Sequence, residues 1–142
     1  MIRFGILISL TLTLSSLSNS HEVRPAYLTI NSTDSSQFYT ASLRQPQIAG
    51  QFLGLYLNTN CEQRPVATEV NNSSVTENYE LDCPKSGLSE IEIVGLERTM
   101  IDTLVSISDS NQPSTLPETV LITGDQPRIE LKSTSYSLPV YL

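Results

Sequence analysis

Most of the chain alternates apolar and polar residues with a step of two. The clearest stretch runs from residue 75 to 83, where Val75, Tyr79, Leu81 and Cys83 share one side, interrupted by Glu77. Such alternation is typical of β-strands that bury one face, and no stretch of comparable length repeats with a helical period. The other alternating stretches are 26–30, 39–43, 53–57, 66–70, 91–93, 101–107, 120–122 and 129–131.

Turn-forming residues separate these stretches. Asn, Ser, Asp, Gly and Pro gather at 31–36, 71–74, 84–87 and 109–117, and the loop 46–52 contains Pro46 and Gly50. Short strands with turns at such intervals predict an all-β fold, an antiparallel immunoglobulin-like β-sandwich of about seven to nine short strands. A closed barrel is the alternative. A single sheet would leave too many apolar side chains in water.

The first 20 residues have the three parts of a secretory signal peptide. Arg3 gives a positive start, residues 4–14 are mostly apolar and uncharged, and Ser18 and Ser20 supply the small residues of a cleavage site. A buried N-terminal helix or an anchor is the alternative. We therefore predict a signal peptide over 1–20, a β-sandwich domain over 21–132, a C-terminal tail over 133–142, and a periplasmic or secreted location.

Cys61 and Cys83 are the two cysteines of the chain. An even number of cysteines in an exported protein predicts a disulfide, and both residues have the parity of the inward side. Two buried free thiols are the alternative. The chain has a formal net charge of −7, with its acidic residues scattered. Such a surface repels phosphate backbones and disfavours binding to nucleic acid.

His21 is the single histidine, and cleavage after Ser20 would place it at the mature N-terminus. Its imidazole and a free α-amine offer two nitrogen ligands suited to nickel or copper, and Glu22 adds an oxygen. A tight site needs three or four ligands, so the alternative is an ordinary strand start.

Two further residues are candidates for interactions. Arg24 precedes Pro25 and can pair with Glu22 or Asp102, while a solvated arginine is the alternative. Asp102 precedes a strand, where a turn or cap is the usual role of aspartate. No nucleophile–base pair can be assembled around a histidine at the chain start, so we expect no catalytic residues and no enzyme.

The mature start, residues 21–28, resembles the start of the HupE/UreJ family, bacterial membrane proteins with an extracytoplasmic β-domain at the N-terminus. The resemblance covers roughly residues 21–131 and continues through Gly54-Leu55-Tyr56-Leu57, Cys61, Leu81-Asp82-Cys83, Leu88, Ile91-Glu92-Ile93, Gly95-Leu96, Thr99 and Asp102-Thr103-Leu104-Val105. It implies a domain that lies outside a transporter-like membrane unit.

The membrane helices of that family have no counterpart here, because no apolar run of about 18 residues follows the signal peptide. Nickel or cobalt permeation therefore does not carry over, and we expect a stand-alone domain or a truncated product. The leading hypothesis is a non-catalytic exported module that binds a partner protein or membrane protein. The alternative is a periplasmic protein that captures nickel or copper through His21.

Overall fold

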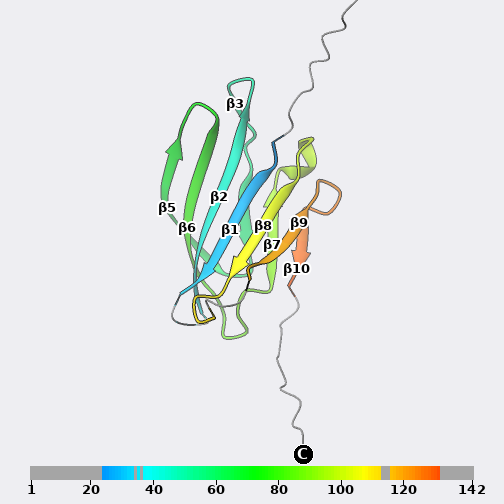
Figure 1. The fold of residues 1–142 in the computed structure, drawn as a ribbon. Coiled ribbons are helices and arrows are strands. Elements are labelled where there is room, and N and C mark those ends of the chain that lie inside the picture. Colours follow the sequence, from blue (N-terminus) through cyan, green and yellow to red (C-terminus); the bar gives the residue numbers. More distant parts are fainter. Residues whose placement is uncertain (1–23, 34, 36, 113–115, 132–142) are drawn as a thin grey trace, which may run out of the picture.

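Two β-sheets make up the fold in a computed structural model, which describes residues 24–33, 35, 37–112 and 116–131. The predicted signal peptide and tail lie outside these residues. The larger sheet, in the foreground of Figure 1, contains β1 (Ala26–Ser32), β2 (Phe38–Ile48), β3 (Gln51–Phe52), β5 (Glu62–Val70), β6 (Ser74–Asp82), β8 (Thr103–Ser108) and β9 (Glu118–Ile122). The smaller sheet contains β4 (Tyr56–Thr59), β7 (Glu90–Val94) and β10 (Arg128–Glu130).

The larger sheet has the strand order β5-β6-β2-β1-β8-β9, with β3 paired to β2, and the smaller sheet has the order β10-β7-β4. Strands β1 and β8 pair in parallel, and the other strand pairs are antiparallel. A short 3-10 helix, η1 (Leu96–Arg98), precedes β8. The prediction of an all-β sandwich with a disulfide is confirmed, and the strand count reaches ten because the two-residue β3 adds to the predicted set.

The core forms where the alternating residues of the two sheets meet. Strand β1 shows the rule most clearly, since Ala26, Leu28 and Ile30 are buried while the residues between them are exposed. The smaller sheet contributes Ile91 and Ile93 from β7. The remaining core members are Ala41, Leu43, Leu55, Leu57, Cys61, Tyr79, Leu81, Cys83, Leu96, Ile101, Val105 and Ile122. Burying these side chains between the sheets is what holds the sandwich together.

The third predicted strand, 53–57, is wrong as a single strand. Gln51 and Phe52 form β3 in the larger sheet, and Tyr56 begins β4 in the smaller one. Between them Gly54 has φ 68°, a left-handed conformation that glycine adopts without a Cβ clash. The chain therefore changes sheets inside a stretch whose leucines keep a period of two.

The second strand was predicted to end before Pro46, but β2 continues to Ile48. Pro46 lies opposite Ser74 of β6, and on the other side the pairing of β2 with β1 extends from Arg44 to Tyr39. A proline inside a sheet is tolerated where its missing N–H faces no partner strand. The predicted loop 46–52 is consequently a β-hairpin formed by the end of β2 and by β3.

The sandwich has two different ends. At the hairpin end, upper in Figure 1, lie the β2–β3 and β5–β6 turns and the start of β1. The two turns are tied together, because the Gln47 N–H donates to the Ser73 carbonyl at 2.9 Å and Gln47 Nε2 donates to the Asn71 carbonyl at 3.2 Å. At the opposite end, called the corner end below, the chain crosses between the sheets after β4 and after β6.

Candidate functional site

The corner end holds the disulfide. Cys61 lies between β4 and β5, and Cys83 follows β6, so the bridge joins the two points where the chain crosses between sheets. The sulfur atoms are 2.06 Å apart and the Cα atoms 4.3 Å apart. Both residues belong to the buried core. The predicted pairing and its inward position are confirmed.

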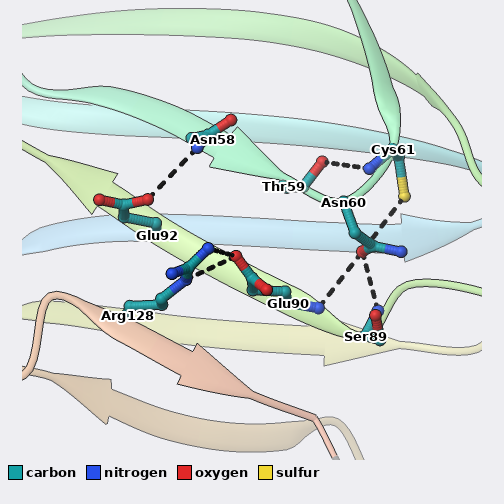
Figure 2. A network of polar contacts seen from close by, with 8 residues as sticks. All are labelled: Asn58, Thr59, Asn60, Cys61, Ser89, Glu90, Glu92 and Arg128. Atoms are coloured by element: carbon teal, nitrogen blue, oxygen red, sulfur yellow. Dashed lines mark hydrogen bonds and ion pairs between the residues drawn. The ribbon is translucent and has the colours of Figure 1, made fainter.

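Asn60 links the same corner to the loop that follows Cys83 (Figure 2). Its Oδ1 accepts the N–H groups of Ser89 at 2.9 Å and Glu90 at 3.2 Å, and its Nδ2 donates to the Gly87 carbonyl at 3.0 Å. Cys61 Sγ lies 3.7 Å from the same Oδ1. This is a contact and not a hydrogen bond, because a disulfide sulfur carries no hydrogen. Asn60 and the bridge therefore serve a structural role.

The polar and charged side chains on the outer face of the smaller sheet are arranged in pairs (Figure 2). Arg128 on β10 donates to the Glu90 carboxylate on β7, and Asn58 Nδ2 donates to Glu92 Oε2 at 3.2 Å. The hydrogen bond to Glu90 raises the pKa of Arg128 above its ordinary value. Exposed pairs of this kind contribute little stability. The pattern is that of a solvated sheet face.

The hairpin end projects into solvent. Ile48 and Phe52 are 49% and 57% exposed, and they lie on opposite faces of the β2–β3 hairpin, because Phe52 opposes Gln47 and Ile48 opposes Gln51. Two residues, Ala49 at φ 52° and Gly50 at φ 74°, form the turn. Positive φ at both positions is typical of a type I′ turn, which matches the twist of a hairpin. We call residues 46–54 the projecting hairpin.

A buried amide closes the base of the projecting hairpin. Gln45, just before it, is 3% exposed, and its Nε2 donates to the Leu55 carbonyl at 2.8 Å while its Oε1 accepts the Leu55 N–H at 3.0 Å. Both polar ends of the side chain are thus satisfied by one backbone residue. The hairpin is held at its root by this pair of hydrogen bonds and at its side by Gln47.

A shallow hollow lies beside the hairpin on the outer face of the larger sheet. Its volume is about 320 Å³. Two arginines, Arg24 and Arg44, line it together with Tyr27, with Ser73 from the turn before β6 and with Ser74, the first residue of β6. Two prolines, Pro25 and Pro46, complete the lining. We call this feature the cationic hollow.

The structure brings Arg24 and Asp102 to the same end of the sandwich but gives them different surroundings. The Asp102 carbonyl accepts the Ala26 N–H at 2.9 Å, which extends the pairing of β1 with β8, and its side chain is exposed. Arg24 instead lines the cationic hollow. An interaction role for either residue stays a prediction.

The predicted metal ligands His21 and Glu22 lie outside the described residues, so a nickel or copper site there stays a prediction. In the part of the chain that the structure describes, no three His, Cys, Asp or Glu side chains gather closely enough to hold a metal ion. Among the same residues, no helix is long and apolar enough to cross a bilayer.

Sequence reasoning missed the cationic hollow and the projecting hairpin. The hollow combines residues from β1, β2 and β6, which only the strand register brings together. A signal for the hairpin was present, because Gln45 is a polar residue at a position whose neighbours in the alternation, Ala41 and Leu43, are core residues. A polar side chain on the buried side of a strand is expected to form hydrogen bonds with another part of the chain, because buried polar groups are rarely left without them.

Fold and site together define a disulfide-linked β-sandwich with a projecting hairpin at one end. No protein-family profile matches the chain, and a search of curated proteins also gives no match.

Proposed function

We propose that this protein is an exported, non-catalytic module that binds a partner protein through its projecting hairpin. The observation that carries the proposal is the exposure of Ile48 and Phe52 on opposite faces of that hairpin. Because the two side chains lie on opposite faces, they form two separate apolar anchors and not one patch. A hairpin with an apolar side chain on each face fits a groove in a partner better than a flat surface.

The hairpin is also anchored to the sandwich by hydrogen bonds. Gln45 fixes its root through Leu55, and Gln47 fixes its side through the β5–β6 turn. A preformed segment loses less conformational entropy when it binds than a flexible one does. Val70, 61% exposed at the end of β5, adds an apolar group on the neighbouring hairpin.

Export is part of the proposal and rests on the signal-peptide pattern of residues 1–20 and on the disulfide. Disulfides persist in oxidising compartments such as the bacterial periplasm. The resemblance to the HupE/UreJ family adds a role beside a membrane protein, which would make the membrane domain of a related protein a suitable partner.

Site-specific photo-crosslinking in the native cell envelope tests the proposal. A photoreactive phenylalanine analogue replaces Phe52 in one variant and Leu116 in a control variant; Leu116 is 92% exposed and lies in the loop between β8 and β9. We expect a discrete protein adduct from position 52 that position 116 does not give. An added Ile48→Asp substitution should abolish it.

Three results would contradict the proposal. The first is the absence of any adduct from position 52. The second is the same adduct from position 116, which would indicate nonspecific proximity. The third is an adduct with lipid alone, which would assign the hairpin to a membrane surface instead of a protein partner.

A further inference from the structure

The cationic hollow concentrates positive charge on an acidic protein. The chain has a formal net charge of −7, yet Arg24 and Arg44 both line a single hollow of about 320 Å³. A guanidinium presents several N–H donors in a planar fork that matches the oxygens of a carboxylate or a phosphate. The Arg44 fork, which donates to a neutral serine hydroxyl, favours an oxyanion as the occupant of the hollow that Arg24 also lines.

Arg44 is held in position by a neutral group. Its Nε donates to Ser74 Oγ at 3.3 Å, and this hydroxyl donates in turn to Asn71 Oδ1 at 3.2 Å. Ser74 is 3% exposed, and Asn71 Oδ1 also accepts the N–H groups of Ser73 and Ser74. The chain of hydrogen bonds fixes Arg44 without neutralising its charge, so the charge is retained for a ligand.

Tyr27 gives the hollow an aromatic wall. It lies directly opposite Arg44 in the antiparallel pairing of β1 with β2, and it is 45% exposed. Pro25 and Pro46 add rigid apolar edges. A half-exposed tyrosine offers both an apolar face for a ring and a hydroxyl for hydrogen bonds. A hollow with these walls suits a small ring that carries a negative charge.

We propose that the cationic hollow binds an acidic sugar. The oxyanion binds the Arg44 guanidinium on the side lined by Arg24, the ring packs against Tyr27, and the exposed Ser73 accepts a hydrogen bond from a sugar hydroxyl. The shared chemistry is an oxyanion on a pyranose ring, which is present both in a uronate and in a sugar phosphate. This site is separate from the partner surface in the proposed function.

Titration of the purified full chain with three sugars tests the proposal. Glucuronate and glucose 6-phosphate carry the two oxyanions, and glucose is the neutral control, all at one ionic strength. Isothermal calorimetry measures the binding. We expect at least one anionic sugar to bind saturably, with an affinity at least tenfold higher than that of glucose. The tighter of the two anionic sugars identifies the carboxylate or the phosphate as the preferred oxyanion.

Matched variants locate the binding. Arg44→Gln is expected to weaken binding at least tenfold, whereas Arg64→Gln, which changes an exposed arginine paired with Glu80 on β6, should leave it unchanged. If Arg44→Gln does not fold, Arg24→Gln replaces it, because Arg24 precedes β1 and is exposed. A Phe52→Asp variant, which removes the proposed partner surface, should keep its sugar affinity.

The proposal is overturned if neither anionic sugar binds, or if glucose binds equally well. Equal losses in Arg44→Gln and Arg64→Gln would also overturn it, because they would indicate attraction to overall charge. None of these results bears on the photo-crosslinking of the hairpin, so the two proposals fail separately.

Discussion

Removing the disulfide should destabilise the whole domain and loosen the corner end first. The perturbation is the double substitution of Cys61 and Cys83 by alanine. It removes the disulfide and reduces the buried side-chain volume only slightly. Cys61 directly precedes Glu62 and Cys83 directly follows Asp82, and these two neighbours are the outermost opposed pair of β5 and β6. The strand register therefore keeps positions 61 and 83 adjacent even without the bond. Removing the bridge mainly increases the conformational entropy of the unfolded chain, and this lowers the stability of the fold.

The size of the loss follows from the separation of the cysteines, which is 22 residues. Closing a loop of that length removes conformational entropy from the unfolded chain worth about 3 kcal/mol at 25 °C. For a domain of this size the same change lowers Tm by about 12 °C. The two opposed carboxylates of Glu62 and Asp82 repel each other, so the ends of β5 and β6 should fray in the variant.

Urea unfolding followed by circular dichroism measures the effect, with the wild-type protein and the double variant each studied with and without dithiothreitol. Reductant should lower the stability of the wild-type protein to that of the variant and leave the variant unchanged. Hydrogen exchange should show the earliest loss of protection at the ends of β5 and β6. A destabilisation under about 1 kcal/mol would refute the reasoning, because the loop-entropy model would then not describe this bridge.

Three further predictions test the hairpin end and the buried polar groups. Gln45→Leu leaves the N–H and carbonyl of Leu55 without their partners and should cost about 3 kcal/mol in urea unfolding, whereas no change would show that the amide is not a clamp. Burial and the hydrogen bond to Glu77 raise the pKa of Tyr79 above its ordinary value. As pH rises past about 10 the unfolded chain therefore loses the Tyr79 proton before the folded chain does, and stability falls. Tyr79→Phe should flatten that fall in urea midpoints measured between about pH 9 and pH 11, and an unchanged slope would contradict the assignment. Ala49→Asn should raise the stability by about 0.5 kcal/mol in thermal melting, because asparagine tolerates the left-handed backbone better than alanine, and a loss would indicate a different turn.

The alternation of residue types predicted many of the buried side chains, because period two records the two faces of a strand directly. It failed on β5, where Val66 and Val70 are 56% and 61% exposed. Leu28 and Ile30 on β1 and Ile91 and Ile93 on β7 are core residues as the pattern requires. Cys61 was placed inward by its parity with Leu57, and it does lie in the core.

The same pattern carries no record of which sheet a strand joins. Leu53 and Leu55 keep the parity of a single strand, although Gly54 between them turns the chain from one sheet to the other. The cationic hollow was unpredictable for a related reason. Arg24 and Arg44 are 20 positions apart, and only the register of β1 against β2, with Tyr27 opposite Arg44, brings them together.

The direction of the chain through the sandwich has a mechanical consequence. Strand β1 begins at the hairpin end and β10 ends at the corner end (Figure 1). Just after β10 the Leu131 N–H donates to the Ser89 carbonyl at 2.8 Å. Tension applied between the start of β1 and the end of β10 would run along the strands. The ladders that join β1 to β2 and β8 would then be loaded in shear, with many hydrogen bonds strained at once instead of one after another. Under such tension the sandwich is therefore expected to resist by shear of whole ladders and not to unzip bond by bond.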